Sequence, residues 1–187
     1  LWHIMKIYSK YGHNDFVVSC GVKSQVIKSY FANYQYYNND FTVDTINQKI
    51  EYHNQNKTEG WKVTLVDTGL NTLKGARIKK VEKYLNADTN MLAYGDCVAD
   101  IDINELVDFH KSHGKIVTLT GVYPPARFGE LIEKDNKIIS FNEKPQTSVG
   151  LINGGFMIFN RDFLEYLNTE QNCDLEIGPI EKLVAEG

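Results

Sequence analysis

Apolar residues along the chain alternate between helical and strand spacing. Apolar positions three and four residues apart predict helices over about residues 2–11, 24–34, 72–84, 102–113, 161–167 and 175–185. Short apolar runs bounded by turn residues predict strands over about residues 16–20, 41–44, 62–66, 90–94, 116–120, 128–133, 137–142 and 152–159. This alternation is typical of an α/β fold, here a Rossmann-like, mainly parallel mixed sheet with helices on both faces. Neither a repeat nor a linker interrupts it, so residues 1–187 are expected to form one domain.

Small and polar residues predict where the helices begin and end. Ser24 and Asp102 are typical N-cap residues, and each precedes a helical pattern. Gly12 and Gly114 are expected to stop the helices before them. Residues 45–60 are polar and rich in Asn, Gln and Lys, so a loop or a weak hairpin is expected there.

Three of the predicted strands end in residues suited to ligand binding. They end at Cys20-Gly21, at Asp67-Thr68-Gly69 and at Gly95-Asp96. The carboxyl ends of parallel strands meet at one edge of a sheet, and ligands bind at that edge. Mg²⁺ prefers one or two carboxylates together with phosphate oxygens, so Asp96 is the strongest candidate for a metal-binding residue. The alternative is that Asp96 caps backbone donors in a turn.

Other candidates lie at the ends and interruptions of the later strands. Pro145 cannot continue a ladder, so Glu143 and Lys144 are expected at a strand end, where the ammonium suits a phosphate. An exposed ion pair is the alternative for these two residues. Asn153-Gly154-Gly155 and Gly129 place glycines in or beside strands, which indicates a bulge or a close approach of backbone to ligand.

A turn into a helix carries the remaining candidates. Thr68, Gly69, Lys74 and Arg77 surround this turn, and helix N-termini attract anions. The alternative for the two cations is a solvated helix surface. His110 and His113 lie three residues apart without a third metal ligand, so a metal site is not expected at this pair.

Composition narrows the classes of partner. Apolar residues make up 42% of the chain and charged residues 24%, which is typical of a soluble globular protein. A net charge of −4 argues against nucleic acid as the main partner, because phosphate-backbone binding usually needs a basic face. The three widely spaced cysteines form no disulfide or zinc pattern, which favours a cytoplasmic protein. No apolar run is long enough for a membrane span. Because the chain starts at Leu1 inside a helical pattern, we expect it to be a fragment.

Together these segments resemble the sugar-1-phosphate nucleotidyltransferases, and within them the cytidylyl-transferring branch. The resemblance covers nearly the whole chain. The segments that carry it are Leu1–Lys6, Ile27–Tyr34, Val63–Gly69, Tyr94–Asp96, Asp108–Lys111, Pro124–Gly129, Glu143–Pro145 and Ile152–Phe156. Gly95-Asp96 and Glu143-Lys144-Pro145 are shared by the wider superfamily. The Trp2–Met5, Val66–Gly69 and Asn153–Phe156 segments are more specific to the cytidylyl branch.

The resemblance implies a reaction and roles in it. A sugar phosphate, glucose 1-phosphate, attacks the α-phosphate of CTP and pyrophosphate leaves, in a pathway that supplies nucleotide sugars for surface polysaccharides. Asp96 is implied to hold Mg²⁺, and Lys144 the sugar phosphate. The residues implied to fix the glucose hydroxyls are Gly129, Glu143, Asn153 and Gly154, and those near the base and triphosphate are Thr68, Gly69 and Arg77. A homo-oligomer is also implied.

The sequence departs from the family pattern in several places. A Gly-rich phosphate loop with a catalytic Arg, and a second metal-binding Asp, are absent from these residues, so the 187-residue chain is expected to be inactive alone. Cys97 and Ala76 stand where glycine is commoner. Alternatives are a related enzyme that uses UTP or dTTP, and a non-catalytic nucleotide-sugar-binding domain. A dehydrogenase is disfavoured because no G-x-G-x-x-G follows a strand.

Overall fold

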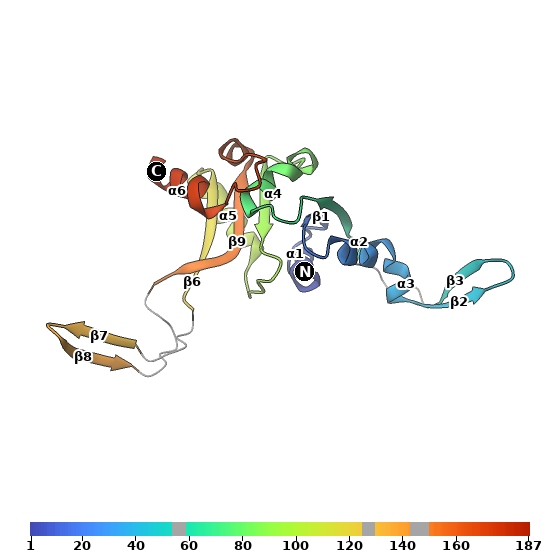
Figure 1. The fold of residues 1–187 in the computed structure, drawn as a ribbon, viewed down its shortest axis with the longest axis horizontal. Coiled ribbons are helices and arrows are strands. Elements are labelled where there is room, and N and C mark those ends of the chain that lie inside the picture. The colour runs from blue at the N-terminus through green and yellow to red at the C-terminus, as the bar shows by residue number, and fades with distance from the viewer. Residues whose placement is uncertain (54–58, 125–129, 143–149) are drawn as a thin grey trace. The chain divides into compact units, whose positions relative to one another are not determined.

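The computed structural model describes residues 1–53, 59–124, 130–142 and 150–187, and Figure 1 shows the order of their elements. The helices are α1 (Trp2–Lys10), α2 (Ser24–Ala32), α3 (Tyr34–Asn38), α4 (Lys74–Val81), α5 (Ile103–His113) and α6 (Glu181–Glu186). The strands are β1 (Asp15–Cys20), β2 (Asp40–Asp44), β3 (Lys49–His53), β4 (Lys62–Asp67), β5 (Thr89–Ala93), β6 (Val117–Val122), β7 (Glu130–Lys134), β8 (Lys137–Asn142) and β9 (Ile152–Asn160). Short non-α turns occupy Glu82–Tyr84, Arg161–Tyr166 and Glu176–Ile180.

The chain divides into two compact units. The first unit contains Leu1 and Thr89–Asn160, and the second contains Trp2–Asp88 and Arg161–Gly187. Each unit has its own sheet and its own buried residues. That residues 1–187 form a single domain stays a prediction.

The second unit is built around the parallel pair of β1 and β4. Asp15 lies opposite Lys62 at the start of this ladder, and Cys20 lies opposite Asp67 at its end. The helix α4 meets the segment before α6 closely, because a Cβ on Gly75 would lie 2.3 Å from the Asp174 carbonyl oxygen. A larger side chain at position 75 would push this helix away, so the glycine sets how α4 packs. The buried apolar residues of this unit are Ile4, Met5, Tyr8, Cys20, Ala76, Ile78, Val81, Phe163, Leu164, Leu167 and Leu175.

The first unit is built around β9, which lies between β5 and β6. Both neighbours pair with β9 in the antiparallel sense. The middle of β9 is a continuous buried run, Phe156–Phe159, as expected for a central strand that is covered on both faces. Ile103 of α5 is fully buried in the same unit.

Two hairpins complete the described strands. The β2–β3 hairpin pairs Phe41 with Tyr52, so the predicted strand at 41–44 has its partner at Lys49–His53, inside the polar stretch for which a loop or a weak hairpin was expected. The β7–β8 hairpin pairs Leu131 with Phe141. Both of these ladders are antiparallel.

The predicted fold class is confirmed as a mixed α/β fold with a parallel β1–β4 ladder and helices. Antiparallel pairing is more extensive than the alternation of strands and helices indicates. The reason is that β9 inserts between β5 and β6, while the two hairpins pair locally. Alternation along the sequence cannot report an insertion of this kind, since it depends on pairing between distant segments.

The helix ends agree with the sequence in part. The Asp102 carboxylate accepts a hydrogen bond from the Glu105 amide at 3.1 Å, so its predicted role as an N-cap is confirmed. Gly12 and Gly114 both have positive φ after their helices, at 87° and 66°. The N-cap assigned to Ser24 is wrong. Its amide donates to the Gly21 carbonyl in a turn, so Ser24 is already the first helical residue.

Candidate active site

The carboxyl ends of β1 and β4 bring Thr68 against the end of the neighbouring strand. The Thr68 amide and its hydroxyl both donate to the Cys20 carbonyl oxygen, each at 2.9 Å. Only 1% of Thr68 is exposed, so these bonds satisfy polar groups that water cannot reach. Thr68 is therefore fixed at the strand edge where ligands bind in folds of this class.

Arg77 of α4 reaches this strand edge. Its guanidinium donates to the Thr68 hydroxyl at 2.6 Å, and more weakly to the carbonyls of Cys20 at 3.4 Å and Leu70 at 3.3 Å. A Cβ on Gly21 would lie 2.6 Å from the guanidinium nitrogens, so the glycine leaves room for this cation. No carboxylate among the described residues forms an ion pair with Arg77. Arg77 has more N–H donors than these bonds use, so it can also bind an anion.

Gly69 and Lys80 belong to the same cluster. Gly69 has a φ of 96°, and a Cβ there would lie 2.7 Å from the Thr72 hydroxyl, so the backbone and the space both require glycine. The Lys80 ammonium donates to the Thr68 carbonyl at 3.0 Å and to the Thr72 hydroxyl at 3.3 Å. Sequence reasoning missed Lys80. It lies three residues after Arg77, so helical spacing could have placed it on the same face.

Lys74 points away from the cluster around Thr68. Its ammonium pairs with the Glu176 carboxylate. Arg77 and Lys80 are thus the two cations of α4 that meet Thr68. The third cation nearby is Lys28, whose ammonium lies 3.9 Å from the Asp67 carboxylate.

Cys20 is not equipped to act as a nucleophile. Burial raises the pKa of its thiol, although the charges of Lys28 and Arg77 work in the opposite direction. A thiol of raised pKa is mostly protonated near neutral pH and reacts slowly. The cluster can therefore position and neutralise anions, but it offers no activated sulfur.

In the first unit, Asp96 lies in a turn that directly follows β5. The Cys97 amide donates to the Tyr94 carbonyl at 3.2 Å, and this bond closes the turn. The Asp96 side chain is exposed, and within the described part of the chain its hydrogen-bond partner is the Cys97 thiol, at a long 3.9 Å. The described residues contain no ion pair to Asp96 and no cluster of three metal-binding side chains. Among the described residues no backbone amide donates to this carboxylate, so the turn holds together without it.

The start of β9 lies beside this turn. The Tyr94 amide donates to the Gly155 carbonyl at 3.0 Å, and the Asn153 amide nitrogen lies 3.3 Å from the Tyr94 hydroxyl. Gly155 has a φ of 78°, and a Cβ there would lie 2.7 Å from the Cys97 sulfur. The structure therefore brings the Asp96 turn together with Asn153 and Gly154. A cavity of about 290 Å³ borders Gly154 and is lined in part by Asp100, Thr120 and Phe156.

The predicted site residues that the structure describes fall into two groups. Thr68, Gly69 and Arg77 meet within the second unit, while Asn153 and Gly154 lie at the start of β9, beside the turn that carries Asp96, within the first. Three further predicted residues, Gly129, Glu143 and Lys144, lie outside the described residues.

The two histidines of α5 form a structural hydrogen-bond chain. His113 Nδ1 accepts from the Lys115 amide at 2.9 Å, so its Nε2 carries the proton when the ring is neutral and donates to the Thr118 hydroxyl. The Thr118 hydroxyl is also hydrogen-bonded to His110 Nδ1 at 2.8 Å, and His110 Nε2 is hydrogen-bonded to the side-chain Oδ1 of Asn160 at 3.0 Å. His110 is buried, and both of its nitrogens are used. This arrangement agrees with the expectation that the pair is not a metal site.

Comparisons with known proteins define the class of this protein. The fold is that of HddC from Yersinia pseudotuberculosis, with a TM-score of 0.58 at 20% identity over 94% of this chain and 68% of that one. Residues 4–186 match the nucleotidyl transferase family. The chain belongs to this family and is therefore a nucleotidyltransferase. None of the described helices is long and apolar enough to cross a membrane.

Two relatives show which members of the family the chain is similar to. It is 43% identical to the glucose-1-phosphate cytidylyltransferase of Salmonella typhimurium, over 100% of this chain and 72% of that protein. It is 27% identical to a UTP–glucose-1-phosphate uridylyltransferase of Synechocystis, over 98% of this chain and 47% of that protein.

Proposed function

We propose that the protein transfers the cytidylyl group of CTP to glucose 1-phosphate, which gives CDP-glucose and pyrophosphate. The observation that carries this proposal is the 43% identity, over the whole chain, with the Salmonella typhimurium enzyme of that name. The identity to the uridylyl-transferring relative is much lower, at 27%. Cytidine is therefore the favoured base.

The reaction is a displacement at phosphorus. An oxygen of the sugar phosphate attacks the α-phosphorus of CTP, the bond from that phosphorus to the β-phosphate oxygen breaks, and pyrophosphate leaves with the electron pair. Because two anions must meet, catalysis depends on cations and hydrogen-bond donors that offset their repulsion. No covalent bond to the protein is required when the reactants are well positioned.

We assign the nucleotide phosphates to the cluster of Thr68, Arg77 and Lys80. Arg77 is held by three acceptors of the protein but has no carboxylate partner among the described residues, so its charge is available to an anion. Lys80 adds a second positive charge through its contact with the Thr68 carbonyl. Gly69 lies in the same turn, where its positive φ and the close approach of Thr72 require a glycine.

Asp96 is the residue we assign to a divalent cation. Its exposed carboxylate, without an ion-pair partner in the described part of the chain, fits the single carboxylate that Mg²⁺ commonly takes from a protein when phosphates supply other ligands. When bound, Mg²⁺ supplies charge stabilisation to the phosphate oxygens. Among the described residues we assign this role to Asp96 alone.

Asn153 and Gly154 are assigned to the sugar. The side-chain Oδ1 of Asn153 accepts a hydrogen bond from the Gly155 backbone amide at 2.9 Å, which fixes the side chain. The side-chain Nδ2 of Asn153 is near the Tyr94 hydroxyl. Asn153 is exposed, so a hydroxyl-rich ligand can replace water there. Gly129, Glu143 and Lys144 complete the proposed sugar-phosphate site from outside the described residues. A cytoplasmic homo-oligomer that supplies polysaccharide synthesis stays a prediction.

Pyrophosphate release tests the choice of substrates. The protein encoded by the full reading frame is assayed with CTP, UTP, dTTP or GTP, each with glucose 1-phosphate and Mg²⁺. We expect kcat/KM for CTP to exceed the others by at least about ten-fold, because a base pocket built for one set of hydrogen bonds rejects another. Equal turnover of UTP or dTTP would move the assignment to a related transferase. Nucleotide-sugar binding without turnover of any pair would favour a non-catalytic domain.

A further inference from the structure

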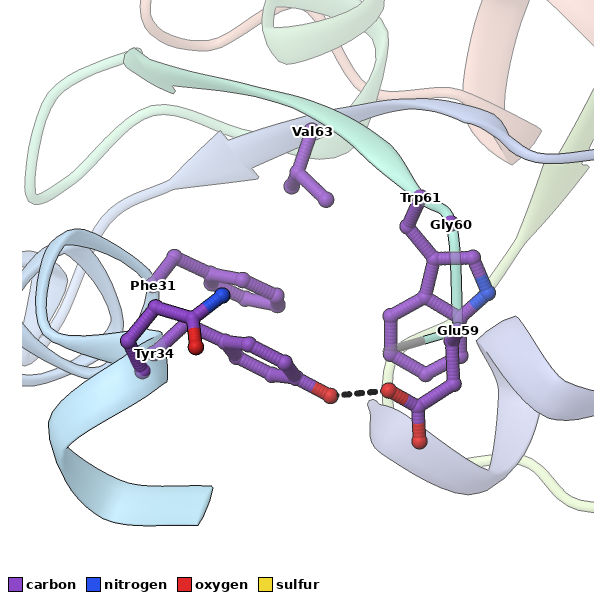
Figure 2. A pocket seen from close by; sticks show the side chains of 7 residues that line it. Phe31, Tyr34, Glu59, Gly60, Trp61 and Val63 are labelled. Atoms are coloured by element: carbon purple, nitrogen blue, oxygen red, sulfur yellow. Dashed lines mark hydrogen bonds between the residues drawn. The ribbon is translucent and has the colours of Figure 1, made fainter. Parts of the chain in front are cut away.

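A pocket of about 360 Å³ lies in the second unit, away from the cluster around Thr68. Figure 2 shows the rings of Phe31 and Tyr34 on one side, Trp61 on the other and Val63 above them. The Phe31 and Tyr34 rings are nearly parallel, with an interplanar angle of 6° and a centroid separation of 6.3 Å. The pocket is completed by Gln35, Glu59 and Gly60.

This pocket is at the opposite end of the β1–β4 ladder from the candidate active site. Trp61 and Val63 flank the first residue of β4, whereas Thr68 follows its last residue. Val63 and Thr68 are five positions apart along an extended segment, so the distance between them along the strand is roughly 16 Å. A ligand in this pocket would therefore not occupy the proposed nucleotide site.

The chemistry of the lining selects for positive charge. Aromatic faces attract cations that lie within about 6 Å of the ring centre. The Glu59 carboxylate adds a full negative charge at the wall, where it accepts a hydrogen bond from the Tyr34 hydroxyl. The side chain of Trp2 also donates to this carboxylate. A carboxylate accepts about four hydrogen bonds, so lone pairs remain for contact with a bound cation.

One cation of the protein acts on this carboxylate already. Lys6 of α1 lies near enough to act on Glu59 electrostatically, and its ammonium lies 5.3 Å from the Trp2 ring centroid. It makes no ion pair with Glu59 within the part of the chain that the structure describes. Among the described residues Glu59 thus has no cation in an ion pair with it, and it lines the pocket together with the rings of Phe31, Tyr34 and Trp61.

We propose that this pocket binds a small organic cation of the alkylammonium class. A quaternary ammonium ion contacts ring faces on several sides and has no N–H groups that need acceptors, so the wall of Phe31, Tyr34 and Trp61 suits it. The volume is within the range of small-molecule sites. Phosphates and nucleotides are disfavoured because Glu59 would repel them.

Binding of choline, with 3,3-dimethylbutan-1-ol as its neutral isostere, tests the proposal. The indole N–H resonance of Trp61 reports binding in the full-length protein without any need for turnover. We expect choline to bind with a Kd on the order of 1 mM, and the neutral alcohol at least about ten-fold more weakly. Glu59→Gln should weaken choline at least about five-fold and leave the alcohol unchanged, since only the cation senses the charge.

The matched control is Glu51→Gln, which neutralises an exposed carboxylate of β3 that does not line the pocket. It should leave choline affinity unchanged. Equal affinities for choline and the neutral alcohol would overturn the proposal, as would choline binding that Glu59→Gln does not alter. Tighter binding of a neutral base such as cytosine would overturn it in favour of a stacking site. None of these outcomes depends on whether the protein uses CTP.

Discussion

Arg77 donates a hydrogen bond to the Thr68 hydroxyl at 2.6 Å, and that hydroxyl donates its own hydrogen bond to the Cys20 carbonyl at 2.9 Å. A cation of α4 is thereby tied to the paired ends of β1 and β4. Because Thr68 is buried, this link is rigid on the protein side and leaves the outer donors of the guanidinium for an anion.

Arg77→Lys should lower kcat/KM for CTP by roughly 10- to 100-fold, because one ammonium cannot contact Thr68, Cys20 and Leu70 together and still bind phosphate. The free energy of unfolding should change by less than about 1 kcal/mol, since the positive charge is retained. Steady-state kinetics and urea unfolding measure the two effects. Lys83→Ala, an exposed cation beyond the same helix, is the control and should be near wild type. Wild-type kcat/KM in Arg77→Lys would remove Arg77 from the nucleotide site.

Asp96→Asn should reduce kcat at least about 100-fold, because the amide retains the shape but loses the charge that a divalent cation needs. The loss should be accompanied by a higher Mg²⁺ concentration at half-maximal rate. Asp108→Asn, which neutralises an exposed carboxylate of α5, is the matched control and should retain activity. If Asp96→Asn keeps the wild-type Mg²⁺ dependence, the assigned metal role is incorrect.

The sequence was sufficient for the parts of the site that depend on local pattern. Asp96 was placed at a strand end by a buried run followed by glycine, and Asp102 was placed at a helix start by residue type; the structure has both there. The contact of Arg77 with Thr68 could not be predicted from the sequence, because it joins a helix face to a strand end and depends on the space that Gly21 leaves. Helical spacing could have placed Lys80 on the same face as Arg77, but its contact with the Thr68 carbonyl depends on the same packing of helix against strand end.

The pairing between distant strands also could not be predicted from the sequence. Apolar alternation identifies β5, β6 and β9 as strands, but not that β9 inserts between the other two. The N-cap at Ser24 failed because a turn from Gly21 captures its amide. In each case the outcome depends on a hydrogen bond to a partner that local residue type does not specify.

Gly155→Ala should destabilise the protein more than an alanine at another glycine of similar backbone. At position 155 the φ of 78° and the approach to the Cys97 sulfur, 2.7 Å from a Cβ, both oppose a side chain. At Gly114 the φ is 66° but no described atom lies within 4 Å, so Gly114→Ala isolates the backbone cost of roughly 1 kcal/mol. We expect an additional 1–3 kcal/mol or so at position 155, from overpacking.

Urea unfolding of the two glycine variants measures this difference. Cys97→Ala in the Gly155→Ala background should recover part of the loss, because it removes the sulfur but keeps the Cβ. Equal destabilisation by Gly155→Ala and Gly114→Ala would show that the turn after β5 does not pack against β9 as described.

The hydrogen bond from Tyr34 to Glu59 predicts a pH-dependent contribution to stability. Burial raises the pKa of Tyr34, and the bond to Glu59 raises it further. Burial alone would raise the pKa of Glu59, but the hydrogen bonds that the carboxylate accepts, with that from Tyr34 first among them, and the charge of Lys6 together lower it. Because the folded-state pKa of Glu59 is lowered, its carboxylate stabilises the fold at pH values above the unfolded-state pKa of about 4.3. Because the folded-state pKa of Tyr34 is raised, its phenol stabilises the fold at pH values below the unfolded-state pKa of about 10.

Tyr34→Phe isolates this contribution. The difference in unfolding free energy between wild type and Tyr34→Phe should be constant from about pH 6 to pH 9, at about 1 kcal/mol. This difference should shrink as the pH falls through the lowered pKa of Glu59. It should also shrink when the pH rises above about 10, where tyrosine in the unfolded chain ionises. Tyr36→Phe, on an exposed tyrosine of α3, is the control. A difference that stays constant from pH 3 to pH 11 would contradict the link between the two groups.

The fate of oxygen isotopes tests the proposed transfer most directly. The full-length protein is incubated with CTP, Mg²⁺ and glucose 1-phosphate that carries ¹⁸O in the non-bridging oxygens of its phosphate, and the products are analysed by mass spectrometry. If the sugar phosphate attacks the α-phosphorus of CTP, all of the label appears in CDP-glucose and none in the released pyrophosphate. Label in pyrophosphate, or pyrophosphate release that does not require glucose 1-phosphate, would contradict the account.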